Sequence, residues 1–357
     1  MSLKYDPEWF AVAGPIVEAT KRIPPLPVHD VEARRQRSRI SYAAWARFHE
    51  AAVAASAAAA STDPNSVPLE PKPSITHTTH TVTAHDGHSL TLHQFGPPLL
   101  SNSPPSPAIL HIHGGGMIIR HMDQQLRLPR LHAGTSHLPV FSIDYRVAPE
   151  SPSPTPLEDA YSALTFLHTH SQLLHIDPSK IAIVGESAGG GLAAGVSLLA
   201  RDRNLQPPLA KQILIYPMLD DRTTTSTAIA PFATWSYADN LTAWSALLGK
   251  DTVGTDKVSP YSAPARAAGT IGLHGLPPTY IDVGGLDIFL HEDLEFAAQL
   301  AKAGVEVEVQ VYPGVPHAFE MIAPGVEVTR RARENRARVM RGFYRSNDDG
   351  KTERSVL

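Results

Sequence analysis

The sequence contains no cysteine among its 357 residues. Disulfide frameworks and thiolate metal sites are therefore excluded, although this absence does not fix the cellular compartment. No stretch approaches the roughly 18 consecutive apolar residues of a membrane-spanning helix. The formal net charge of −4 gives no support for binding to nucleic acid or to a membrane surface.

The composition is that of an ordinary globular protein, with 42% hydrophobic and 18% charged residues. A chain of this length accommodates one large α/β domain, or a core domain with a smaller cap. The first residues, MSLKYDPEWFAVAGP, include early acids and a proline and lack the apolar run of a signal peptide. We therefore expect a soluble protein in the cytoplasm.

The N-terminal part has a helical pattern. Asp30 is placed to cap a helix that continues into an alanine-rich segment. Ile40, Ala44 and Phe48 recur at the spacing of one helix face. This face has only moderate apolar bulk, so we expect the helix to pack on the rest of the fold rather than to anchor in a membrane.

From residue 75 the apolar pattern changes to a period of two. The runs THTTHTVTA and SLTLHQF flank the turn pair Asp86-Gly87, which predicts a β-hairpin. Four histidines in this segment raise the alternative of a metal site: His77, His80, His85 and His88. Because no cysteine completes a ligand set, we interpret them as polar residues on the exposed face and at the turn.

Beyond the hairpin, strands alternate with helices. Strands are expected at 108–113, 140–145, 180–184, 212–216, 279–283 and 305–312, and helices at 157–170, 292–303 and 326–344. Residues 218–270 interrupt this rhythm, with one expected helix around 241–248, and are typical of an insertion. The alternation predicts a mostly parallel, eight-stranded sheet that helices cover on both faces.

The last expected helix is rich in arginine, with Arg330, Arg331, Arg333, Arg336, Arg338, Arg341 and Arg345. A nucleic-acid patch is one interpretation. A solvated helix face is favoured, because the chain is net acidic and no aromatic stacking platform accompanies the arginines.

The segment KIAIVGESAGGGL has the G-x-S-x-G pattern between a β-branched strand and a small-residue helix start. Ser187 is thereby placed on a sharp turn with its hydroxyl above the sheet edge. Gly185 and Gly189 remove Cβ atoms where the strand and the helix nearly touch. The flanking strand and helix argue against a chance match, so Ser187 is the candidate nucleophile.

A serine hydroxyl needs a base within hydrogen-bond reach and an acid that orients the base. In a doubly wound sheet both must come from loops at the carboxyl ends of later strands. Asp287 and His317 follow the expected strands at 279–283 and 305–312, and both loops contain glycine. Other acids are less suitable: Asp282 lies inside a strand, and Glu292 with Asp293 begins the next helix.

Stabilisation of the tetrahedral oxyanion requires amide donors. The loop after the strand at 107–113 contains three consecutive glycines, and Gly115 and Gly116 are the expected donors. The Ala188 amide at the helix start joins them. A phosphate cradle is excluded by context, because the loop lacks both the P-loop ending and the dinucleotide-site spacing.

Taken together, these motifs resemble the hormone-sensitive-lipase-like carboxylesterases, which have the α/β-hydrolase fold. The resemblance covers roughly residues 75–345 and rests on HGGG at 113–116, DYRVAPE at 144–150, GESAGGG at 185–191, the Asp287 loop and PHAF at 316–319. It implies the order nucleophile Ser187, acid Asp287 and base His317, with His113, Gly114, Gly185, Glu186 and Gly189 as supporting motif residues. It also implies an oxyanion hole and a helical cap over the site.

Three departures from the family pattern stand out. Glu186 replaces the aspartate of many members and keeps the charge with a longer reach. Ile288-Phe289 follows the acid where many members have Pro-Leu. The segment after the glycines, MIIRHMDQQ, lacks the further glycine common in the family, which leaves the mouth of the substrate pocket undefined.

We therefore predict an N-terminal helical part of the cap at 1–60, a first part of the catalytic core at 61–217, a cap insertion at 218–270 and a second core part at 271–357. The predicted activity is a serine carboxylesterase acting on short- to medium-chain esters, without cofactor or metal. The predicted partner is a small-molecule ester, with no nucleic acid and no membrane span; a homodimer is left open.

Two other functions stay open. One is a hydrolase or acyltransferase dedicated to a natural-product ester or lactone, and the other is a ligand receptor on the same fold. Cap aromatics are candidates for an apolar pocket, with packing against the core as the alternative for each: Trp9, Phe10, Phe232, Trp235 and Tyr237.

Overall fold

A computed structural model describes residues 3–43, 47, 75–97, 103–120, 125–224 and 226–344. Its strands are β1 (Thr76–Thr83), β2 (Ser89–Gly96), β3 (Ser106–Ile112), β4 (Val140–Ile143), β5 (Ile176–Glu186), β6 (Lys211–Ile215), β7 (Thr279–Gly284) and β8 (Val307–Tyr312). Its helices are α1 (Pro7–Lys21), α4 (Arg127–Ser136), α5 (Thr155–Thr169), α6 (Ala188–Asp202), α7 (Tyr237–Leu248), α8 (Leu290–Lys302), α9 (Phe319–Ile322) and α10 (Glu327–Gly342). Short 3-10 helices are η1 (Ala230–Phe232) and η2 (Pro264–Gly269), and one further helix covers 31–43.

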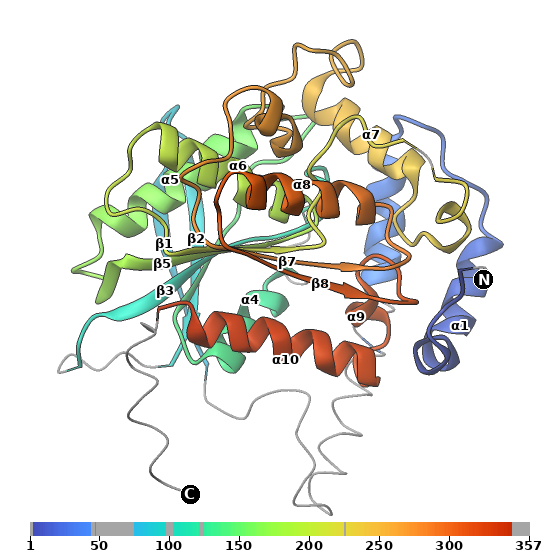
Figure 1. Ribbon diagram of the computed structural model, residues 1–357, viewed down its shortest axis with the longest axis horizontal. Helices are drawn as coiled ribbons and strands as arrows, with labels where there is room; N and C mark the ends of the chain where they lie inside the picture. Colours follow the sequence, from blue (N-terminus) through green and yellow to red (C-terminus); the bar gives the residue numbers. More distant parts are fainter. Residues whose placement is uncertain are drawn as a thin grey trace, which may run out of the picture.

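The described strands form one eight-stranded sheet in the order β1-β2-β4-β3-β5-β6-β7-β8 (Figure 1). β1, β2 and β4 pair antiparallel, and every pairing from β4 through β3 to β8 is parallel. The predicted mostly parallel sheet with an antiparallel edge is confirmed. β4 and β5 lie on opposite sides of β3, so the strand order reverses at β3. Open α/β sheets bind their ligands at the carboxyl ends of the strands next to such a reversal.

Helices cover both faces of the sheet, as predicted (Figure 1). One layer contains α5, α6 and α8, and the opposite layer contains α4 and α10. α6 is buried along nearly its whole length, because its glycines and alanines let it lie close to β5 and β6. This central helix starts directly after Ser187, so its position sets the place of the predicted nucleophile.

The predicted hairpin is confirmed by the pairing of Thr83 with Ser89 across the turn. Gly87 takes the positive φ of 85° that the turn requires. His77 approaches His93, with 3.1 Å between their ring nitrogens, and stacks on Phe95. His77, His85 and His88 are exposed and His80 is half-buried, which agrees with their interpretation as polar residues on the exposed face and at the turn.

The described residues of the N-terminal part are helical, as predicted, at α1 and at 31–43, and residues 22–30 between them are not helical. Asp30 caps the second helix as predicted, accepting a bond from the Ala33 amide at 2.9 Å. The predicted packing face is wrong at Ile40, which is 68% exposed. Arg34, 1% exposed, faces the fold instead, because its guanidinium bonds to main-chain carbonyls. Ala44 and Phe48 lie outside the described residues.

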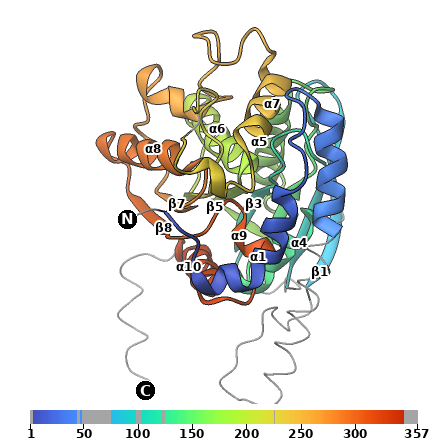
Figure 2. The same ribbon diagram turned by 90° about the vertical axis from the view of Figure 1, so that its right-hand side faces the viewer.

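The second N-terminal helix packs against α7 of the 218–270 segment (Figure 2). Arg34 and Arg37 both pair with Asp239, at 2.9 and 2.7 Å. The His29 amide also donates to Thr242 Oγ1 at 2.9 Å. Two segments about 200 residues apart in sequence therefore meet on the same side of the molecule, while the boundaries of the predicted cap stay predictions.

The arginines of α10 do not all lie on a solvated face. Arg330, Arg331, Arg338 and Arg341 are exposed. Arg336 is only 4% exposed and donates to Asp282 at 2.7 and 2.8 Å and to Glu320 at 2.6 Å. The solvated-face interpretation is wrong at Arg336, because the buried carboxylate of Asp282 requires a cation beside it. Arg345 lies outside the described residues.

No described helix has both the length and the apolar character needed to cross a membrane.

Candidate active site

Ser187 stands at the turn between β5 and α6 with φ 56° and ψ −121°. This conformation is strained for a residue with a Cβ. It is held by the Ser187 amide, which donates to the Ile215 carbonyl at 2.9 Å. A Cβ on Gly185 or on Gly189 would collide with neighbouring backbone. The sequence pattern thus predicts this turn for a steric reason that the structure shows.

The structure brings Ser187, His317 and Asp287 into one hydrogen-bonded chain. His317 Nε2 lies 2.9 Å from Ser187 Oγ, and His317 Nδ1 lies 2.7 Å from Asp287 Oδ2. Asp287 is fully buried, and Ser187 and His317 are 9% and 8% exposed. A carboxylate accepts the Nδ1 proton, which leaves Nε2 free to accept the serine proton.

The two partners of Ser187 are themselves fixed. The second oxygen of Asp287 accepts from the Phe289 amide at 3.0 Å. The His317 ring makes T-shaped contacts with the rings of Tyr216 and Phe289, with centroids 4.7 and 5.1 Å away. These contacts limit rotation of the imidazole, so the orientation required for proton transfer is built before substrate arrives.

Among the described residues, none of the other candidate acids bonds to His317. Asp282 pairs with Arg336. Glu292 accepts from the Leu219 amide at 2.7 Å and from the Thr223 hydroxyl, and burial raises the pKa of Glu292 to about 8. Asp293 is fully buried, and its oxygens have no partner among the described residues, so burial raises the pKa of Asp293 well above its usual range. Asp287 is the acid that reaches His317.

The glycine loop after β3 lies against this chain. A Cβ on Gly114 would lie 2.9 Å from the Glu186 carbonyl oxygen and 3.4 Å from Ser187 Cβ. Gly115 and Gly116 have positive φ values of 113° and 61°. In the described part of the chain, neither amide donates to a backbone carbonyl. Ala188 opens α6, where amides have no acceptor within the helix.

Comparison with known proteins places this geometry in a family. Residues 109–321 match the family described as alpha/beta hydrolase fold. This chain belongs to that family.

Curated relatives of this hydrolase are esterases. It is 34% identical over 240 residues to Esterase LipI of Mycobacterium tuberculosis, covering 63% of this chain and 69% of that protein. It is 33% identical over 229 residues to Carboxylesterase NlhH of the same species, with the same coverage. The solved structure of a bacterial heroin esterase aligns with a TM-score of 0.76 and 30% identity over 96% of this chain and 99% of that one.

These comparisons confirm the predicted fold class and the predicted membership of the hormone-sensitive-lipase-like carboxylesterases. The hydrolase is accordingly a carboxylic ester hydrolase.

Sequence analysis missed a support of the glycine loop. Tyr145 donates to the His113 carbonyl at 2.9 Å, and its ring stacks on the His113 imidazole with centroids 4.2 Å apart. His113 itself is buried, and this burial lowers its pKa to about 4. The DYRVAPE motif contains Tyr145, but no local pattern indicates a bond to a residue 32 positions away.

Of the aromatic residues predicted to line an apolar pocket, some lie at the candidate site and others pack away from it. Trp235 lies over the glycine loop, since a Cβ on Gly116 would come within 2.8 Å of its ring. Trp9 is fully buried and donates to the Phe319 carbonyl at 3.0 Å, so it packs beside α9. Phe232 contacts Tyr5 of the N-terminal segment.

One group of side chains in the described residues has the composition of a metal site. His111, His132 and Glu186 are buried, with one ligand atom from each lying within 4.8 Å of the others. The motif residue Glu186 is therefore turned into the core beneath Ser187. His111 and His132 were not singled out from the sequence, because nothing local distinguishes them among 18 histidines.

Proposed function

We propose that this hydrolase is a serine carboxylesterase that transfers an acyl group first to Ser187 and then to water. The hydrogen-bonded chain of Ser187, His317 and Asp287 carries this proposal. His317 Nε2 takes the serine proton as Oγ attacks the ester carbonyl, and returns it to the leaving alcohol. In the second half, His317 takes a proton from water as the water attacks the acyl-enzyme. The bond from the acyl group to Ser187 Oγ then breaks, His317 returns the proton to Oγ, and the acid is released. These steps require neither a metal nor an organic cofactor.

The oxyanion hole in this proposal consists of the Gly115, Gly116 and Ala188 amides. Its support is the closeness of the glycine loop to Ser187 and the absence of backbone acceptors for Gly115 and Gly116 in the described residues. The α6 macrodipole adds positive potential at the same place. Loss of one such donor typically costs about 100- to 1,000-fold in rate.

We propose short- to medium-chain esters as the substrates. The Trp235 ring stands directly over Gly116, where there is no room for a Cβ. Thr234 donates to the His317 carbonyl at 2.7 Å, so the cap segment also contacts the base loop. The chain is 29% identical over 247 residues to an ethyl acetate hydrolase of Pseudomonas putida, whose name specifies a small ester.

Two alternatives remain. A hydrolase or acyltransferase dedicated to one natural-product ester or lactone would use the same Ser187 chemistry but turn over generic esters weakly. A non-catalytic receptor is disfavoured, because His317 is present and bonded to both of its partners. Cytoplasmic location, homodimer formation and the four-part domain division also remain proposals from the sequence.

The decisive experiment is hydrolysis of p-nitrophenyl esters from acetate to palmitate by the wild type and by Ser187→Ala. We expect serine-dependent turnover that falls with chain length, and loss of activity in a variant that stays folded by circular dichroism. Retained activity in Ser187→Ala would place the nucleophile elsewhere. A wild type that fails on the whole series but is labelled by an organophosphonate would indicate a dedicated substrate.

A further inference from the structure

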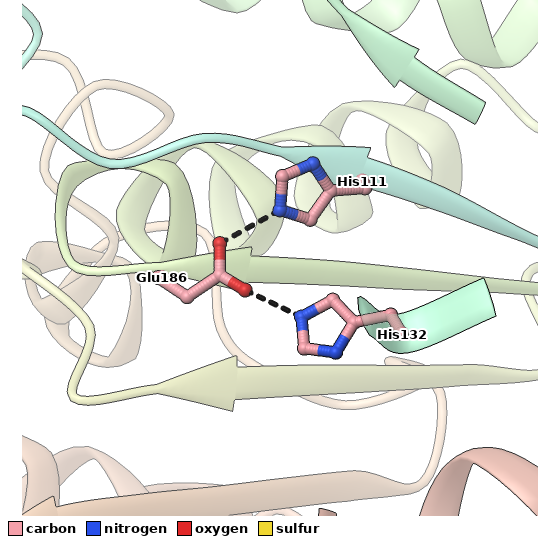
Figure 3. A group of neighbouring side chains, drawn as sticks. All are labelled: His111, His132 and Glu186. Carbon is pink, nitrogen blue, oxygen red and sulfur yellow. Dashed lines mark hydrogen bonds and ion pairs between the residues drawn. The ribbon is translucent and has the colours of Figure 1, made fainter. Parts of the chain in front are cut away.

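A buried histidine–carboxylate–histidine cluster lies directly behind the nucleophile. Glu186, the residue before Ser187, is 3% exposed, and His111 and His132 are 0% and 6% exposed. Figure 3 shows the Glu186 carboxylate between the two imidazoles, with one oxygen directed to each ring. Oε2 lies 2.8 Å from His111 Nε2, and Oε1 lies 2.7 Å from His132 Nε2. The acyl-transfer steps do not use this cluster.

The hydrogen bonds define the charge state of Glu186. An ionised carboxylate only accepts, so each imidazole donates an Nε2 proton to it. His111 Nδ1 lies 2.9 Å from Ser142 Oγ, which fixes the other side of that ring. Burial acts to raise the pKa of Glu186, but the two imidazoles outweigh it and hold the pKa well below its usual range. Glu186 is therefore an anion with a donor on each oxygen.

The cluster connects the two parts of the site that must be aligned. Glu186 is the last residue of β5, His111 belongs to β3, and His132 belongs to α4, which covers this end of the sheet. The glycine loop begins two residues after His111. The bond from Glu186 to His111 thus joins the strand that ends in the nucleophile to the strand that ends in the oxyanion loop.

This alignment needs support because the nucleophile turn is strained, with φ 56° at Ser187. The turn and the loop already touch at the Glu186 carbonyl, where there is no room for a Cβ on Gly114. Ser187 Oγ and the loop amides must act on the same tetrahedral centre. A misplacement of about 1 Å can cost about 100-fold in rate.

We propose that Glu186 is a positioning residue for ester hydrolysis: through His111 and His132 it holds the nucleophile turn at a set distance from the oxyanion loop. This inference rests on the proposed function of Ser187. The same three groups are ligand types that Zn²⁺ accepts. Each is already paired by a hydrogen bond, so the structure favours positioning, and zinc binding is an outcome of the test.

The test compares Glu186→Leu, Glu186→Gln and a control, Asp159→Asn. The control removes the charge of Asp159, a buried residue of α5 that pairs with Arg146 at 2.6 Å. Measurements are kcat and KM on p-nitrophenyl acetate, the rate of Ser187 labelling by an organophosphonate, and the melting temperature. We expect Glu186→Leu to lose about 100-fold in kcat and labelling rate, with KM nearly unchanged.

Glu186→Gln should recover at least about tenfold over Glu186→Leu, because the amide keeps the side-chain length and bonds both rings if one changes tautomer. Asp159→Asn should lower the melting temperature and leave kcat unchanged. If Glu186→Leu behaves like Asp159→Asn, the positioning role is wrong. If Glu186→Leu does not fold, His132→Gln carries the same test, with an expected kcat loss of about tenfold.

Two further outcomes are informative. One zinc ion per chain in purified wild type, or inhibition by added Zn²⁺ that His132→Gln abolishes, would overturn positioning in favour of a metal site. A wild type that turns over no ester but is labelled at Ser187 would contradict the proposed substrates alone. In that case the labelling rates of the Glu186 variants still decide the positioning role.

Discussion

The predicted catalytic edge is the end of the sheet from which Ser187, Asp287 and His317 project. Different interactions hold this edge and the contact between α7 and the helix at 31–43. At the catalytic edge, parallel backbone ladders and the buried α6 fix the strand ends from which Ser187, Asp287 and His317 project. The α7 contact depends on a few charged side chains, chiefly the ion pairs that Arg34 and Arg37 form with Asp239. Backbone ladders arise from short-range sequence patterns, whereas these charge pairs join residues about 200 positions apart.

This difference has a functional counterpart. The catalytic edge must hold atoms within tenths of an ångström, and many cooperative bonds do so. A cap over the site has to allow substrate entry, and a contact made of a few polar pairs is easier to open. Substitutions at the catalytic edge should therefore reduce turnover and leave the stability unchanged. Substitutions at the α7 contact should reduce the stability and leave turnover unchanged.

Beyond Ser187→Ala, the largest expected effect is that of Asp287→Asn. An amide cannot hold His317 in the tautomer that accepts the serine proton, so kcat should fall by about 10,000-fold. Steady-state kinetics with an active-site titrant measure this loss. Glu292→Gln is the matched control on the following helix and should retain kcat within severalfold; a larger loss in Glu292→Gln than in Asp287→Asn would show that the acid is misassigned.

Gly116→Ala should have the next largest effect. The new Cβ would lie 2.8 Å from Trp235 at a φ of 61°, so the loop must shift and misdirect an oxyanion donor. We expect kcat to fall by about 100- to 1,000-fold. Gly87→Ala provides the control, because it also has positive φ but no atom within 4 Å and lies in the hairpin turn; comparable losses of kcat in both variants would argue against the oxyanion role.

Glu292 should make stability depend on pH. Burial raises its pKa from 4.5 to about 8, so the folded chain keeps a proton that the unfolded chain releases. The free energy of unfolding should then fall by up to a few kcal/mol as pH rises from about 4.5 to 8, and stay high below this window. Urea titrations across pH 4.5–9 measure it. Glu292→Gln should make this dependence less steep, with the remainder coming from Asp293, and an unchanged profile would assign it to other groups.

The smallest expected effects come from the α7 contact. Arg34 and Arg37 lie on the same helix and share Asp239, but their side chains are 1% and 32% exposed. Arg34→Met leaves the buried Asp239 carboxylate with only the partly exposed Arg37 beside it and should destabilise by about 3 kcal/mol. Arg37→Met should cost less than about 1 kcal/mol. Chemical denaturation of both variants tests this ranking, and equal losses would show that burial does not control the strength of this contact.

Much of the fold was predictable because the relevant signals are local. Apolar residues that alternate with polar ones on both sides of Asp86-Gly87 specify the hairpin. Runs of β-branched residues followed by glycine specify where the parallel strands end. Ser187, Asp287 and His317 each follow such a run, which is why the structure brings all three together. The wrong predictions concern Ile40 and Arg336, where side-chain pairing rather than periodicity decides burial.

The sequence by itself determined the strand–turn–helix at Ser187, the glycine loop and the loops that carry Asp287 and His317, because steric limits and strand periodicity act over a few residues. Only the tertiary structure decided that Arg336 neutralises Asp282, that Arg34 pairs with Asp239, and that His111 and His132 hold Glu186. These pairings depend on which buried charges the fold brings within about 3 Å of one another, and no local pattern encodes that distance.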